Sequence, residues 1–68
     1  MTVVVNGHEH QLPETATVAD LVRSVGRDPS QAGTAVARNG AVVPRRSWDQ
    51  THLRNSDAVE IVTAVGGG

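Results

Sequence analysis

The chain opens with two short β-favouring runs that are separated by an Asn-Gly pair. They are TVVV and HEHQL, on either side of Asn6 and Gly7. Asn and Gly tolerate the positive φ angles that both central positions of a type I′ hairpin turn require. The pattern therefore predicts strands at about 2–6 and 8–12. Side chains alternate along a strand, so Val4 faces away from the valines on either side of it.

A helical period follows the first hairpin. Four apolar residues recur at the spacing i, i+3, i+4 and i+7, which places them on one helix face: Val18, Leu21, Val22 and Val25. Thr17 with Asp20 three residues later resembles a capping box in which Asp replaces the usual Glu. Gly26 suits the left-handed position just past a helix end. We therefore predict a helix over 18–25, too short to be stable unless it packs on a sheet.

A second hairpin is predicted after a polar loop. The segment TAVARNGAVV, residues 34–43, carries another Asn-Gly pair at its centre, and Pro44 ends its second arm because proline cannot donate to a sheet ladder. The faces of this hairpin stay ambiguous. Val36 and Arg38 share a face by parity, and they cannot both belong to the core.

The last third of the chain reads as an irregular segment and a final strand. Residues 45–57 are polar, with Trp48 and Leu53 as the apolar side chains expected to plug the core. The run AVEIVTAV, residues 58–65, predicts a strand. Glu60 should face water, which turns its two neighbours inward and places Val62 and Ala64 on the outward face.

These elements predict an α+β domain over residues 1–65, followed by a flexible glycine tail at 66–68. One helix across one face of a mixed sheet is the economical arrangement. If the first and last strands are neighbours, Val4, Val62 and Ala64 lie together on the open face. Exposed apolar patches often mark partner sites. The alternative is that isolated outward valines are ordinary surface residues.

Composition narrows the function classes. The chain has 68 residues, no cysteine and a formal net charge of −1. Disulfides and thiolate metal sites are therefore excluded, a deep catalytic cavity is not expected in so short a chain, and no polyanion-binding surface is indicated. No apolar run is long enough to span a membrane and no secretion signal is visible, so we expect a cytoplasmic protein that binds neither membrane nor nucleic acid.

Candidate chemistry inside the domain is sparse. No serine has the context of a nucleophile, and the terminal glycines do not form a phosphate-binding loop. His8 and His10 point the same way on a strand, and His52 would have to complete a metal site by folding; a solvated strand face is the favoured interpretation, and no metal is predicted. Arg45 and Arg46 are interpreted as a solvated pair, with docking of an acidic partner as the alternative.

The chain ends on Gly66, Gly67 and Gly68. Three extended residues span about 10 Å, and without side chains they can thread a narrow channel and present a carboxylate at its end. A partner would have to offset the cost of ordering them, about 1–2 kcal/mol per residue. The alternative is a frayed terminus, which is common in domains of any function.

Four segments resemble the ubiquitin-like sulfur carrier proteins, and among them the ThiS-type carriers of thiamine thiazole biosynthesis. They are VVVNG, TVADLVRSVG, AVARNGAVVPRRSW and DAVEIVTAVGGG. The resemblance covers essentially the whole chain, and its most specific parts are ARNGAVVPRRSW and the terminal Gly-Gly. The chain departs from the pattern at Ser56, since many relatives have Gly-Asp in the turn before the last strand.

The resemblance implies a β-grasp fold, with four to five strands and one main helix on one sheet face. It implies a protein co-substrate without catalytic residues or a bound cofactor. A ThiF-like adenylating enzyme would activate the Gly68 carboxylate with ATP and Mg²⁺. A sulfur donor such as a cysteine desulfurase would then convert it to a thiocarboxylate, and a ThiG-like thiazole synthase would take the sulfur. Gly66 and Gly67 would enter the partner's active site.

Other functions remain open at this point. The same chemistry serves carriers that resemble the small subunit of molybdopterin synthase, or that feed cysteine or natural-product biosynthesis. A ubiquitin-like modifier would instead join its terminal glycine to other proteins. In each case we expect a monomer that forms hetero-complexes.

Overall fold

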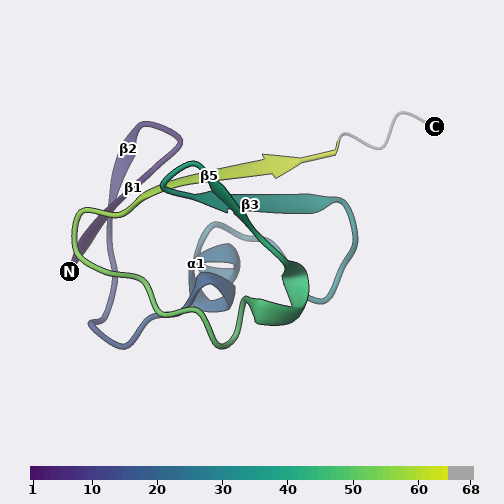
Figure 1. Ribbon diagram of the computed structural model, residues 1–68, viewed down its shortest axis with the longest axis horizontal. Coiled ribbons are helices and arrows are strands. Elements are labelled where there is room, and N and C mark those ends of the chain that lie inside the picture. The colour runs from purple at the N-terminus through teal and green to yellow at the C-terminus, as the bar shows by residue number, and fades with distance from the viewer. Residues whose placement is uncertain (65–68) are drawn as a thin grey trace.

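The structure is a computed structural model that describes residues 1–64 of the chain. Within these residues the elements follow the order predicted from the sequence (Figure 1): β1 (Thr2–Val5), β2 (His8–Gln11), α1 (Val18–Ser24), β3 (Thr34–Arg38), β4 (Ala41–Val43), the 3₁₀ helix η1 (Arg45–Ser47) and β5 (Ala58–Thr63). The short helix η1 lies in the segment for which the sequence predicted irregular structure.

The five strands form one mixed sheet in the order β2-β1-β5-β3-β4. β5 is its central strand, parallel to β1 and antiparallel to β3. The helix α1 lies across one face of the sheet, and the described residues place no second helix on the other face (Figure 1). The predicted arrangement of one helix on a mixed sheet is thereby confirmed. The first and last strands, β1 and β5, are neighbours in this sheet.

Both Asn-Gly turns form as predicted, and each also holds β5. Asn6 and Asn39 adopt positive φ angles of 51° and 50°. The side chain of Asn6 accepts a hydrogen bond from the Ile61 N–H at 2.9 Å and donates one to the Ile61 carbonyl at 3.0 Å. Asn39 accepts a hydrogen bond from the Ala58 N–H at 2.9 Å. The central strand is therefore held on both sides by turn side chains as well as by its ladders.

The helix begins with the predicted capping box. The Thr17 hydroxyl accepts from the Asp20 N–H at 3.2 Å, and the Asp20 carboxylate accepts from the Thr17 N–H at 3.0 Å. Val25 caps the other end, one residue earlier than predicted, and Gly26 then takes a φ of 86°. Four of the seven helical residues are buried, so packing on the sheet stabilises a helix too short to persist alone.

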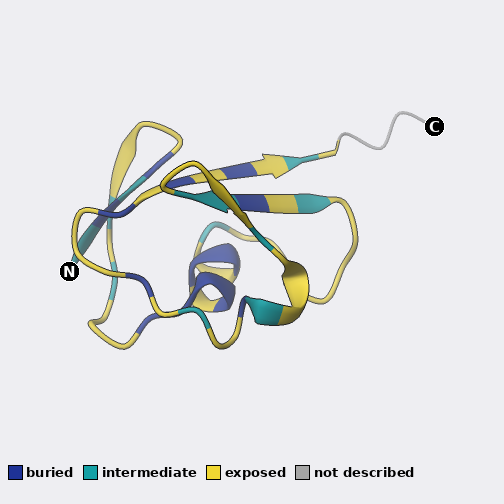
Figure 2. Ribbon diagram, in the orientation of Figure 1, coloured by how far each residue is buried: buried dark blue, intermediate teal, exposed yellow. Residues whose placement is uncertain are grey.

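Core side chains come from one helix face, from alternate strand positions and from the segment after η1 (Figure 2). The largest fully buried ones are Leu21, Val3, Val18, Val22, Val36 and Val59. Trp48 and Leu53 are exposed by only 2% and 3%, which confirms that they plug the core. The Trp48 indole N–H also donates to the Val43 carbonyl at 2.8 Å, so the side chain is buried without an unsatisfied donor.

The structure resolves the ambiguous faces of the second hairpin. Val36 and Arg38 do share a face, and only Val36 belongs to the core, at 1% exposure. Arg38 lies at the end of β3, where its Nε donates to the Asp57 carboxylate at 2.8 Å. A partly buried charge is tolerated on the core face because an opposite charge meets it there.

The last strand is shorter than predicted. β5 ends at Thr63 instead of continuing to 65. Its ladder partner β3 starts only at Thr34, which pairs with Thr63, so no strand continues beside the next residue. Ala64 lies beyond the strand, although its N–H still donates to the Gly33 carbonyl at 2.6 Å. The predicted boundary between domain and tail at residues 65 and 66 lies outside the described residues.

Candidate functional site

The site begins where β5 leaves the sheet. Thr63 is the final residue of the strand and pairs with Thr34, and the Ala64 N–H bonds to Gly33. The residues proposed to carry the chemistry, Gly66, Gly67 and Gly68, follow this point and lie outside the described residues. In the sequence, the glycines thus come shortly after the end of the central strand of the sheet.

The described helices leave the face of the sheet opposite α1 uncovered, and the strands have exposed positions there (Figure 2). Val42 and Val62 are its large exposed apolar side chains, with 76% and 62% of their surface accessible. A depression of about 330 Å³ is lined by Gly33, Thr34, Ala35, Val62 and Ala64. Small side chains at the end of β5 therefore leave room for a partner surface beside the point where the tail begins.

The three residues that the sequence placed together on this face separate into two locations. Val62 and Ala64 both line the depression, whereas Val4 pairs with Ala58 in the parallel register of β1 and β5. Val4 is on the same face as Val62. However, Val62 lies four residues, or about 13 Å, along β5 from Ala58, the residue beside Val4. All three residues therefore belong to the open face, while the register separates Val4 from the other two along it. Parity gives the face, while the strand register decides the distance.

The start of β5 is anchored by the buried carboxylate of Asp57. This carboxylate accepts from the Arg54 N–H at 2.7 Å, from Arg38 Nε at 2.8 Å and from Asn39 Nδ2 at 3.0 Å. Burial alone raises the pKa of Asp57, but these hydrogen bonds and the Arg38 charge outweigh burial and hold its pKa below the usual value. This network was not predicted. Its only signal in the sequence was that Arg38 falls on the same strand face as Val36, which is a core residue.

The turn before β5 carries a backbone constraint at Ser56, where the resemblance led us to expect glycine. Ser56 has a φ of 71°, in the left-handed region. The Asp57 N–H closes the turn by donating to the Arg54 carbonyl at 3.0 Å. A glycine would adopt this φ without steric cost, which explains why Gly-Asp suits this position.

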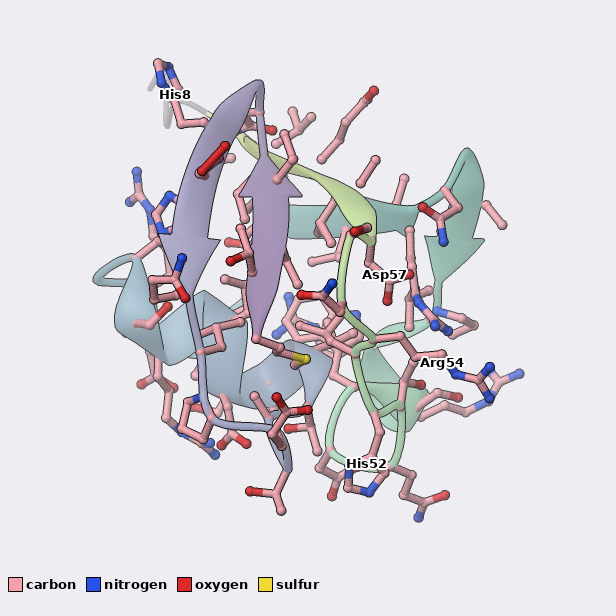
Figure 3. All side chains as sticks on the ribbon, turned by 90° about the vertical axis from the view of Figure 1, so that its left-hand side faces the viewer. His8, His52, Arg54 and Asp57 are labelled. Carbon is pink, nitrogen blue, oxygen red and sulfur yellow. The ribbon has the colours of Figure 1, made fainter. Side chains whose placement is uncertain are left out.

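The histidines do not form a metal centre in the described part of the chain. His8 and His52 lie at opposite ends of the molecule in Figure 3, and His10 is on β2 with His8. Within residues 1–64 no three His, Cys, Asp or Glu side chains come together as metal ligands. His52 instead lies with its Nδ1 3.2 Å from the Thr15 carbonyl, beside the start of the helix.

Arg45 and Arg46 have different environments. The Arg45 guanidinium stacks on the Trp48 ring at 4.6 Å and donates to the Pro29 and Thr34 carbonyls. Arg45 therefore ties the 27–33 loop to η1. Both arginines line a depression of about 320 Å³ whose other charged groups are Arg23, Asp28 and Asp49. Positive and negative groups are mixed in this depression, so it has no clear charge preference.

Sequence similarity to a known protein family extends to the last residue of the chain. The model of the ThiS family covers residues 3–68. This chain belongs to the ThiS family. It is 31% identical over 68 residues to the sulfur carrier protein ThiS of Escherichia coli strain K12, and the match spans 100% of both chains. The crystal structure of the thiamine biosynthesis protein ThiS from Geobacter metallireducens superposes with a TM-score of 0.78 at 32% identity, again over 100% of both chains.

These similarities confirm the ThiS-type resemblance and the β-grasp fold that the sequence indicated. A second kind of relative is much longer. The chain is 37% identical over 68 residues to a thiazole synthase of Paramagnetospirillum magneticum, of which it spans only 20%. A ThiS-like segment therefore also occurs within polypeptides named for thiazole synthesis.

The described part of the chain contains no helix with the length and apolar character needed to cross a lipid bilayer.

Proposed function

We propose that this chain carries sulfur for the formation of the thiamine thiazole ring, as a thiocarboxylate on Gly68. The observation that supports this most directly is the full-length match to a sulfur carrier protein of the same size, within a family match that reaches Gly68. In this proposal the protein is a co-substrate: it supplies the atom that is transferred and binds no cofactor of its own.

The chemistry requires activation by another protein. A carboxylate is a poor electrophile, so a ThiF-like enzyme would join it to AMP, consuming ATP with Mg²⁺ and releasing pyrophosphate. The outer sulfur of a persulfide, supplied by a donor such as a cysteine desulfurase, would attack the acyl carbon and expel AMP. A thiol would then cleave the S–S bond and leave the thiocarboxylate. Since the chain contains no cysteine, it has no thiol of its own that could intercept the adenylate.

The fold holds β5 firmly, and the glycines without side chains follow this strand in the chain. β5 is held by the Asn6 and Asn39 side chains and by two neighbouring strands. We infer that Gly66 and Gly67 enter a narrow partner channel in extended form, where only backbone can pass. The apolar depression at Val62 and Ala64 would then lie against the partner around the channel mouth.

Thiazole synthase is the proposed acceptor of the sulfur. The supporting observation is that relatives named thiazole synthase contain a segment similar to this whole chain. Covalent linkage of two functions in some proteins is consistent with physical association of the separate proteins in others. Carriage of sulfur for another pathway remains the alternative, and the choice of acceptor in the assay below distinguishes the two.

Intact-mass spectrometry tests the proposal on a protein whose last residue is Gly68. After incubation with the adenylating enzyme, ATP, Mg²⁺ and a persulfide donor, we expect the mass change for one oxygen replaced by sulfur. The product should then transfer its sulfur when thiazole synthase and its substrates are added.

Two variants locate the sulfur on the terminal carboxylate. A protein with one alanine added after Gly68 keeps every residue of the domain but should accept no sulfur, because the added side chain obstructs the channel. A protein that lacks Gly68 should also fail. Sulfur incorporation in the absence of Gly68, or no incorporation into the unaltered protein, would contradict the proposal.

A further inference from the structure

Glu60 is the single charged residue among the outward-facing positions of β3, β4 and β5 that the structure describes. It lies between Ala58 and Val62 along β5 and opposite Ala37 on β3. The next residue across, on β4, is Val42, which pairs with Ala37. Along β5 and toward β3 and β4, the exposed carboxylate thus has only alanine and valine neighbours on this face.

Glu60 has no opposite charge beside it in residues 1–64. The ion pairs within these residues are Met1 N-terminus–Glu14, Arg23–Asp20 and Arg38–Asp57. On the β1 side the neighbouring residue is Asn6, whose side-chain amide is already bonded to the backbone of Ile61. The carboxylate is therefore hydrated in the free protein, without a partner in the described fold.

The two exposed valines lie close enough to Glu60 that a partner covering both must also cover the carboxylate. Val62 is two residues along the same strand face, about 7 Å away, and Val42 is two strands away, about 10 Å. These spacings are smaller than the width of a protein interface. Apolar docking on this face would remove water from Glu60.

A purely apolar partner would leave this carboxylate dehydrated and unpaired, which opposes binding strongly. We propose that the adenylating enzyme docks on the open face through apolar contacts around an arginine or lysine that pairs with Glu60. This inference rests on the proposed function, since it assigns the occupant of the face to the enzyme that activates Gly68. Glu60 would then select the partner, because a neutral or acidic surface of the same shape would be rejected.

If Glu60 instead serves to prevent association, removing its charge should have the opposite effect on binding. Charged side chains on exposed sheets can simply discourage unwanted association. In that case the carboxylate is a cost to docking, and removing its charge strengthens binding or leaves it unchanged. The sign of the effect of Glu60→Gln therefore separates the two roles.

Binding of the adenylating enzyme, measured by isothermal titration without ATP, tests the inference. We expect Glu60→Gln to weaken binding about 10-fold or more, and Glu60→Lys about 100-fold or more, because it places two cations together. The unaltered protein should also show weaker binding as salt increases, with a smaller salt dependence in Glu60→Gln.

Asp49 offers matched controls. It is exposed, and it follows Trp48, whose carbonyl accepts from Ala19 of the helix, so it belongs to the side of the molecule that α1 occupies. Asp49→Asn and Asp49→Lys make the same changes in charge and should alter affinity less than twofold. Thermal unfolding should show all four variants to be folded, since both residues are at the surface.

Each outcome decides a separate point. Unchanged or tighter binding by Glu60→Gln, or equal losses for the Glu60 and Asp49 variants, would overturn the role of Glu60 while the sulfur assay stands. Normal binding without sulfur incorporation would overturn the proposed function and leave the Glu60 result interpretable. No binding of the unaltered protein to the adenylating enzyme would overturn the docking inference.

Discussion

Replacing Ser56 with glycine should stabilise the domain. Ser56 occupies the third position of the turn that runs from Arg54 to Asp57, with a φ of 71°. A side chain at this φ brings Cβ close to the backbone. The Ser56 hydroxyl makes one weak contact, accepting from Asn55 Nδ2 at 3.4 Å at the surface, so its loss removes little. The backbone bond from the Ser56 N–H to the Thr2 carbonyl, at 2.7 Å, is unaffected by the substitution.

The magnitude follows from two opposing terms. A left-handed conformation costs an L-residue roughly 1–2 kcal/mol relative to glycine. Glycine loses about 0.4–1 kcal/mol of that advantage, because its unfolded chain has more conformational freedom to lose. The midpoints of the two ranges differ by about 0.8 kcal/mol, so the free energy of unfolding should rise by about 0.5–1 kcal/mol. For a domain of this size that corresponds to a rise in melting temperature of roughly 2–8 °C.

Urea denaturation followed by Trp48 fluorescence measures this effect, since Trp48 is the only aromatic residue and is 2% exposed. Asn39→Gly is the informative comparison. Asn39 also has a positive φ, of 50°, but its side chain bonds to Ala58 and Asp57, so its replacement should destabilise. Ser56→Ala removes the hydroxyl and keeps Cβ, and should give no gain. Stabilisation by Ser56→Ala, or none by Ser56→Gly, would refute the backbone explanation.

Two other substitutions test the anchor of β5 and the core. Asp57→Asn should lower the free energy of unfolding by about 2–3 kcal/mol at pH 7, because it leaves the partly buried Arg38 charge without its partner. The folded-state pKa of Asp57 lies below its unfolded value of about 3.9, so the stability it contributes is present above about pH 4 and is lost as pH falls through the folded pKa. Urea titrations from pH 7 to pH 2.5 should show a smaller loss for Asp57→Asn than for the unaltered protein, and parallel pH profiles would disprove this linkage. Leu21→Ala should cost about 3–4 kcal/mol, because Leu21 is fully buried under the sheet; a loss below about 1 kcal/mol in the same titration would mean that the core closes around the missing side chain.

Most elements were predictable because their signals are local. The two Asn-Gly turns, the capping residues Thr17 and Asp20, and the apolar period of the helix each act over a few residues. The errors arose where the structure depends on residues distant in sequence. β5 was predicted to continue to 65, since nothing in AVEIVTAV indicates that its partner β3 begins only at Thr34.

The candidate site divides in the same way. The glycine tail and the outward direction of Val62 were read directly from the sequence, because composition and parity are properties of the chain itself. The separation of Val4 from Val62 depends on the parallel register of β1 and β5. The isolation of Glu60 depends on which residues of β3 and β4 come to lie beside it.

The sequence by itself determined the order of the elements, their turns, the faces of their side chains and the glycines at residues 66–68. These follow from φ preferences and side-chain periodicity, which operate within a few residues. Only the tertiary structure decided that Asn6 and Asn39 clamp β5, that Arg38 meets Asp57, and that Glu60 stands alone between Val42 and Val62. Each of these depends on contacts between segments far apart in the chain, and their register is set when the whole core packs together.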